Sequence, residues 1–224
     1  MSVAAAFEPA DAQLKDALLA LLKVAKEQGR RVTLTRMKAA KLLYLADLAA
    51  VSDGMPPISG ASWKWHDYGP FDYALYDVED QLLWSNKMNR QDGRILQAMH
   101  GSVVLSLADD VKQVEDPLPP GAMGILRRIV VEHGAKNATT LKDLSYATPP
   151  MAEAQAGGQR GVVLNLDRAR EAKKVRALIE RHRALLQDQG VDQDDPGVAA
   201  ELIAEQTEFD ELRRRANTKE LGDE

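Results

Sequence analysis

The 224-residue chain contains no cysteine, and this absence alone excludes several kinds of site. Disulfide bonds, thiolate metal centres and cysteine nucleophiles all require a thiol. Aromatic residues make up only 5% of the chain. No apolar run approaches the roughly 20 residues of a membrane-spanning helix, and the N-terminus lacks the basic and apolar stretches of a secretion signal. We therefore expect a cytoplasmic protein with no membrane partner.

The sequence also lacks the short motifs of the common enzyme classes. Neither GxSxG nor HExxH occurs, and neither does a phosphate-binding or dinucleotide-binding glycine motif. The four histidines are scattered, and none has a second ligand at a metal-binding spacing: they are His66, His100, His133 and His182. We expect no catalytic residues, no metal, no cofactor and no enzymatic activity.

The net charge of −5 is unevenly distributed along the chain. Residues 191–224 hold eleven acidic and four basic residues, a net charge of −7, which leaves +2 for residues 1–190. This near-neutral body lacks the basic excess of a dedicated nucleic-acid-binding domain. We divide the chain into a domain of residues 1–190 and an extension of residues 191–224, in which an acidic linker precedes an amphipathic helix from Val198 to Ala216.

Hydrophobic periodicity predicts a mainly α fold with a small β element. The most apolar helix runs from Thr35 to just before Asp53, and its surroundings predict Leu42 and Leu45 to be core residues. Further helices are predicted from Asp11 to Gln28, Pro70 to Trp84, Gly121 to His133, Thr140 to Leu144 and Asp167 to Gln189.

Short extended segments supply the β element. Trp63–His66 alternates apolar and polar residues, as a half-buried strand does. Arg94–Met99 and Ser102–Leu107 flank His100-Gly101, which predicts a hairpin. Val162–Leu164 is a candidate third strand.

Aromatic residues concentrate in one short stretch, which holds Trp63, Trp65, Tyr68 and Phe71 within nine positions. Such residues commonly form a core, and this interpretation is favoured. Alternation along a strand can instead turn both tryptophan rings to one side, where Trp and Tyr are frequent anchors of protein interfaces. These four residues are therefore the candidate partner-binding site.

Two segments rich in basic residues allow alternative interpretations. Arg36, Lys38 and Lys41 could face phosphates if the first two helices bound DNA, but the second helix offers only Asp47 as a polar residue between Lys41 and Ser52, so burial is the better explanation. The helix from Asp167 carries seven basic and four acidic residues. It is either a solvated face beside an apolar stripe or a basic platform for an acidic partner.

The segments KLLYLAD, at residues 41–47, and YGPF, at residues 68–71, with a glycine and tryptophans between them, resemble the core signature of the Panacea, or SocA-like, antitoxin domain. Residues 141–151 look like a later element of that family, although Pro149 and Met151 stand where the family has His and Trp. The similarity covers roughly residues 11–180.

The resemblance implies a mostly helical antitoxin that neutralises a cognate toxin by direct protein contact. In the SocA-like branch, the implied mechanism is that the antitoxin tethers the toxin to a AAA+ protease. Masking and proteolytic delivery both stay open, and the acidic extension is a candidate tether. The competing interpretations are a DNA-binding regulator of its own operon, although we do not expect a nucleic-acid partner, and an enzyme for which no residues nominate a reaction.

Overall fold

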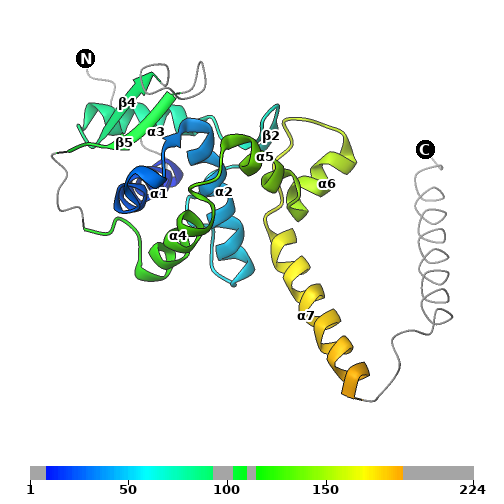
Figure 1. Cartoon of the computed structure of the whole chain (residues 1–224). Helices are drawn as coiled ribbons and strands as arrows, with labels where there is room; N and C mark the ends of the chain where they lie inside the picture. The colour runs from blue at the N-terminus through cyan, green and yellow to red at the C-terminus, as the bar shows by residue number, and fades with distance from the viewer. Residues whose placement is uncertain (1–8, 93–102, 110–114, 189–224) are drawn as a thin grey trace, which may run out of the picture. The chain divides into compact units, whose positions relative to one another are not determined.

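The computed structural model describes residues 9–92, 103–109 and 115–188 (Figure 1). The chain divides into two units, Met1–Lys174 and Val175–Glu224. The fold is mainly helical with small antiparallel strand elements, which confirms the predicted fold class. No helix in the described ranges has both the length and the apolar character needed to cross a membrane. The predicted extension, residues 191–224, lies outside the described residues.

The described residues form seven α-helices, one 3-10 turn and five strands. In order they are α1 (Pro9–Glu27), the 3-10 turn η1 (Gly29–Arg31), β1 (Leu34–Thr35), α2 (Arg36–Ser52), β2 (Lys64–His66), β3 (Gly69–Phe71), α3 (Ala74–Trp84), β4 (Met88–Asp92), β5 (Val103–Leu107), α4 (Pro120–His133), α5 (Ala138–Tyr146), α6 (Pro149–Gly157) and α7 (Asp167–Asp188).

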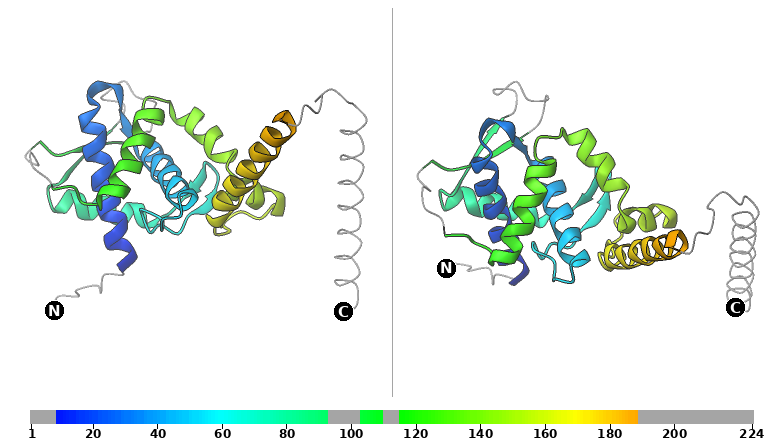
Figure 2. Two further views of the ribbon diagram at one scale, coloured as in Figure 1. Left: turned by 90° about the horizontal axis from the view of Figure 1, so that it is seen from below. Right: turned by 60° about the horizontal axis from the view of Figure 1, so that its bottom comes forward.

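Helix α2 lies at the centre of the first unit. It packs against α1, α4 and α5 and against strands β1, β3 and β5, and both views of Figure 2 show it beside α1 and α4. Thr35 caps its N-terminus by accepting a hydrogen bond from the backbone N–H of Lys38 at 3.3 Å. The predicted span of this helix is confirmed, and so is the prediction that Leu42 is a core residue, but the prediction that Leu45 is one is wrong. Leu42 is fully buried, whereas Leu45 is only partly buried.

A three-stranded antiparallel sheet has the strand order β1-β5-β4. Its register places Leu34 opposite Leu105 and Met88 opposite Leu107. The sequence predicted that β5 would pair with Arg94–Met99. This prediction is wrong, because the strand paired with β5 at these positions is β4, Met88–Asp92. Residues 94–99 and the turn at His100-Gly101 lie outside the described residues.

Strands β2 and β3 form a second, two-stranded antiparallel hairpin. Trp65 pairs with Pro70 and His66 pairs with Gly69, so residues 67 and 68 form the turn. Gly69 has a φ of +91°, a conformation that glycine adopts without a steric penalty. The predicted helix start at Pro70 is therefore wrong, because Pro70 lies in a strand and α3 begins at Ala74.

The last third of the first unit also departs from the prediction. Helix α5 is capped by Asn137, whose side chain accepts from the backbone N–H of Thr140 at 2.8 Å, so Thr140 is not the cap. Helix α6 was not predicted. Val163 makes an isolated antiparallel bridge to Lys64, and backbone hydrogen bonds join Val162 to Trp65 and Leu164 to Trp63, so the candidate third strand lies beside β2 without forming a regular strand.

We expect Leu42→Ala to lower the free energy of unfolding by about 2 to 5 kcal/mol, the range for truncating a fully buried leucine. Leu45→Ala, three residues along the same helix, is the matched control and should cost clearly less because its side chain is only partly buried. Urea denaturation of both variants measures the difference. Equal losses at the two positions would contradict the burial described for α2.

Candidate partner-binding site

Three polar side chains lie on one face of the buried helix α2, namely Lys41, Tyr44 and Asp47. A spacing of three residues keeps successive side chains on neighbouring positions of a helix surface. All three are buried. Asp47 contacts the segment that leads to the β2–β3 hairpin, Lys41 contacts the hairpin itself, and Tyr44 contacts Thr148 at the start of α6.

Asp47 binds the segment that leads to the hairpin. Its carboxylate accepts hydrogen bonds from the backbone N–H groups of Ile58 and Ser59 at 2.7 and 2.8 Å, from the Ser59 hydroxyl, and from the indole N–H of Trp63 at 2.7 Å. Burial raises the pKa of the Asp47 carboxyl, and the hydrogen bonds oppose that rise. Four donors on one buried carboxylate fix the path of the chain from Ile58 to Trp63.

Tyr44 contacts the same tryptophan from the adjacent turn of α2. Its ring meets that of Trp63 edge-on, with the ring centroids 5.7 Å apart. Its hydroxyl shares a 2.8 Å hydrogen bond with the hydroxyl of Thr148, which also donates to the carbonyl of Ser145 at 2.6 Å. Tyr44 therefore connects α2 both to the aromatic segment and to the junction of α5 and α6.

Lys41 binds the hairpin itself. Its ammonium donates to the carbonyl of Pro70 at 2.6 Å and lies so close to Gly69 that a Cβ there would approach Nζ to 3.3 Å and the Tyr146 ring to 3.0 Å. Burial, together with repulsion from Lys142, lowers the pKa of Lys41 to about 7. Glycine is thus favoured at position 69, the first residue of β3, by its backbone conformation, and a side chain there would also require these two neighbours to shift.

The structure separates the four predicted partner-binding residues into two groups. Trp63, Trp65 and Phe71 belong to the core, with Trp63 only 1% exposed, whereas Tyr68 at the hairpin turn is 67% exposed. The two tryptophans are therefore not side by side on an open face, because each is covered by the elements packed on the hairpin. Partner binding at these positions stays a prediction, and of the four only Tyr68 is open to a partner in this fold.

Two exposed tyrosines that sequence reasoning missed lie next to the hairpin. Tyr73 and Tyr76 are 60% and 41% exposed, and their rings stack with centroids 6.1 Å apart. The ring of Tyr73 contacts the rings of His66 and Phe71, and Arg36 lies over the ring of Tyr76 at 4.6 Å. We call Tyr73 and Tyr76 the tyrosine surface.

Arg36 holds this region of α3 against the start of α2. It makes a bidentate pair with Glu79, with the Nε and Nη2 atoms each 2.7 Å from a carboxylate oxygen. Glu79 is buried, and its hydrogen bonds raise the pKa of Arg36. A charge pair with this geometry favours a single position of α3 relative to α2.

The cations proposed for a DNA-binding interpretation of α2 all have partners inside the fold. Arg36 pairs with Glu79, the ammonium of Lys38 donates to the carbonyl of Gly134 at 2.9 Å, and Lys41 donates to Pro70. None of these three groups is presented to a phosphate in this conformation.

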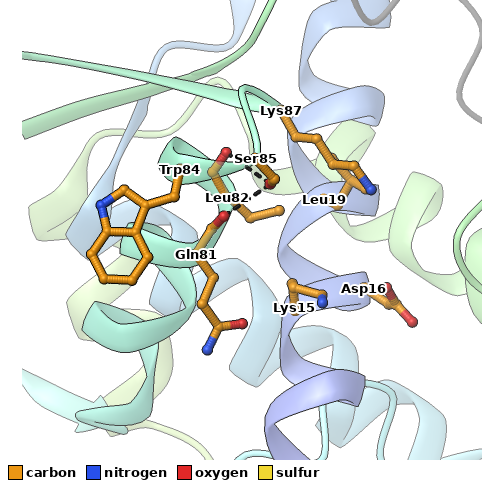
Figure 3. Close-up of a pocket in the computed structure, with 8 residues that line it drawn as sticks. All are labelled: Lys15, Asp16, Leu19, Gln81, Leu82, Trp84, Ser85 and Lys87. Carbon is orange, nitrogen blue, oxygen red and sulfur yellow. Dashed lines mark hydrogen bonds between the residues drawn. The ribbon is translucent and has the colours of Figure 1, made fainter. Parts of the chain in front are cut away.

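A cavity of about 390 Å³ lies between α1 and the end of α3 (Figure 3). Its lining residues are Lys15, Asp16, Leu19, Gln81, Leu82, Trp84, Ser85 and Lys87. The Ser85 hydroxyl is already used, because it donates to the backbone carbonyl of Gln81 at 2.8 Å. Trp84 is 83% exposed at this site, and none of the lining residues belongs to the tyrosine surface.

Comparison of the chain with models of protein families, with curated proteins and with solved structures gives no match. The resemblance to the antitoxin domain therefore depends on the sequence motifs alone. What the structure adds is a physical role for those motifs: Lys41, Tyr44 and Asp47 of the first motif hold the segment that carries Trp63 and the second motif.

We expect Asp47→Asn to lower the free energy of unfolding by about 1 to 3 kcal/mol, because the amide would turn an N–H toward a buried donor such as Trp63. Asp53→Asn is the matched control. Asp53 ends the same helix and pairs with Arg128 and Lys173 at the surface, where such pairs contribute about 1 kcal/mol or less. Chemical denaturation compares the two, and a smaller loss at Asp47 than at Asp53 would contradict its assigned role.

We expect the stability of the protein to rise with pH above 7 because of Lys41. The pKa falls from the ordinary 10.5 to about 7 in the folded state, so between these values the unfolded chain binds a proton that the folded chain does not. The stability gain should approach about 1.4 kcal/mol per pH unit at most, and Lys41→Met should remove it. Denaturation at pH 6.5, 8 and 9.5 tests this, and parallel curves for the two proteins would show that the pKa is not lowered.

Proposed function

We propose that this protein is an antitoxin that neutralises a cognate toxin by direct protein contact, with the tyrosine surface as the contact site. The proposal begins from the resemblance of residues 41–47 and 68–71 to the Panacea, or SocA-like, domain. The observation that carries it further is the pair of stacked, exposed tyrosines beside the hairpin that contains the second motif.

Two physical features support this proposal: the tyrosine rings are exposed, and their positions are fixed by neighbouring side chains. Tyr and Arg are enriched among the residues that contribute most to protein interfaces, and here Arg36 lies against Tyr76 while being fixed by Glu79. Because the rings of Phe71 and His66 pack against the ring of Tyr73, the Tyr73 side chain has little conformational freedom left to lose when a partner binds. Such a surface is suited to recognition of a folded protein.

The first experiment is co-expression with the product of a neighbouring gene. The proposed function predicts that this product arrests growth when expressed alone, that co-expression restores growth, and that the two proteins co-purify. A toxin half-life shortened by co-expression would assign delivery to a AAA+ protease, and an unchanged half-life would assign masking. A genomic neighbourhood without a toxic or binding product would refute the proposed function.

The second experiment locates the contact. Tyr73→Ala and Tyr76→Ala should each weaken toxin binding by roughly tenfold or more, since tenfold corresponds to about 1.4 kcal/mol. Trp84→Ala is the matched control, because it is an exposed aromatic residue at the far end of the same helix and lines the separate cavity. Calorimetric titration measures affinity, and circular dichroism verifies folding. Loss of binding in Trp84→Ala alone would move the contact site to the cavity.

A further inference from the structure

The second half of helix α7 exposes an apolar stripe. Within the second unit, Val175, Leu178, Ile179 and Leu185 are 54%, 68%, 44% and 52% exposed. With the exposed His182 they recur at intervals of three and four residues, so they lie along one side of the helix. A helix with such a stripe normally has it covered by another element.

The charge beside this stripe restricts what can cover it. Between Val175 and Leu185 the helix carries Arg176, Arg181 and Arg183 against Glu180, a net charge of +2. A second copy of the same helix would bring like charges together, which destabilises helix pairs. An acidic amphipathic helix would match both the stripe and the charge.

We infer that residues 198–216 of the same chain pack antiparallel on this stripe and form a helical hairpin with α7. The segment has a net charge of −2, and residues 191–224 together have −7. Nine residues, 189–197, connect it to the end of α7. They can span up to about 30 Å, well beyond the 8 to 10 Å between packed helix axes.

The order of apolar positions in the two segments supports one register. Along α7, Val175, Leu178 and Leu185 are separated by three and then seven residues, whereas Leu202, Phe209 and Leu212 are separated by seven and then three. An antiparallel arrangement reverses one of the two orders and therefore places the apolar residues in pairs: Val175 with Leu212, Leu178 with Phe209, and Leu185 with Leu202.

The same register places a polar pair within the interface. His182, the polar position within the stripe, falls opposite Glu205, whose carboxylate can accept a hydrogen bond from the imidazole N–H. A polar pair at facing positions of two helices favours one register and one orientation. This inference does not depend on the proposed function, since it concerns only residues of the second unit.

Engineered disulfides in the full-length protein test the register, because the natural chain has no cysteine to interfere. The matched pairs are Leu178→Cys with Phe209→Cys, and Leu185→Cys with Leu202→Cys. The mismatched controls exchange the partners, so that 178 is combined with 202 and 185 with 209. A seven-residue offset moves the sulfurs about 10 Å apart along the helix axis, beyond the Cα separation of about 7 Å that a disulfide allows.

Under mild oxidation we expect both matched pairs to close within the chain at least about tenfold faster than the mismatched pairs, as measured by mass spectrometry and non-reducing gels. Equal rates for matched and mismatched pairs would overturn the inference, and so would disulfides formed mainly between chains.

A basic amphipathic helix can also bind an anionic membrane surface. Slow closure of the matched pairs, together with sedimentation of the wild-type protein with phosphatidylserine vesicles, would assign the stripe to a lipid surface and overturn the hairpin.

Discussion

The buried carboxylate of Asp47 is the interaction on which the arrangement of the first unit depends. A charged group at this depth is costly unless its oxygens are fully hydrogen-bonded, and here backbone, hydroxyl and indole donors meet both oxygens. These donors come from a segment with little regular secondary structure, residues 58–63. The helix therefore gives that segment a conformation that its own backbone hydrogen bonds would not specify.

The hydrogen bonds of Asp47 also affect the position of surface residues, because they fix Trp63 and the hairpin that follows it. Once Trp63 is fixed by Asp47 and Tyr44, the strand that follows it has a defined start. Lys41 then holds the returning strand through the carbonyl of Pro70. The exposed tyrosines follow within a few residues of this point, so their position is determined by polar groups buried in α2. If a partner binds this surface as proposed, a surface supported in this way changes little between the free and bound states.

Most helices could be predicted from the sequence, because their boundaries depend on local signals. The stop before Asp53-Gly54 is a property of neighbouring residues, and both ends of α2 lie within one residue of the predicted bounds. Helix α6 was missed although Pro149-Pro150 occupies its first turn, where proline is favoured. That local signal was available in the sequence.

The errors at the site have a different cause, because they depend on contacts between distant parts of the chain. Pro70 is an acceptable first residue of a helix, but pairing with Trp65 draws it into a strand. The burial of the tryptophans depends on α2 and on Tyr146, which lie far away in the sequence. Strand β4 is too polar to be recognised alone, and only its partner β5 gives it an extended conformation.

The distribution of polar residues on α2 also explains why its pattern was informative about burial but not about function. A helix that is buried on nearly all sides has no polar face from which its neighbours could be inferred. Each of its few polar side chains must therefore form hydrogen bonds with the segment that packs on it. Lys41, Tyr44 and Asp47 each do this with a different segment. A substitution that keeps the size of such a residue but changes its donors therefore affects the hairpin before it affects the packing of the helix. The motif that resembles an antitoxin domain is, in physical terms, the support of the surface and not the surface itself.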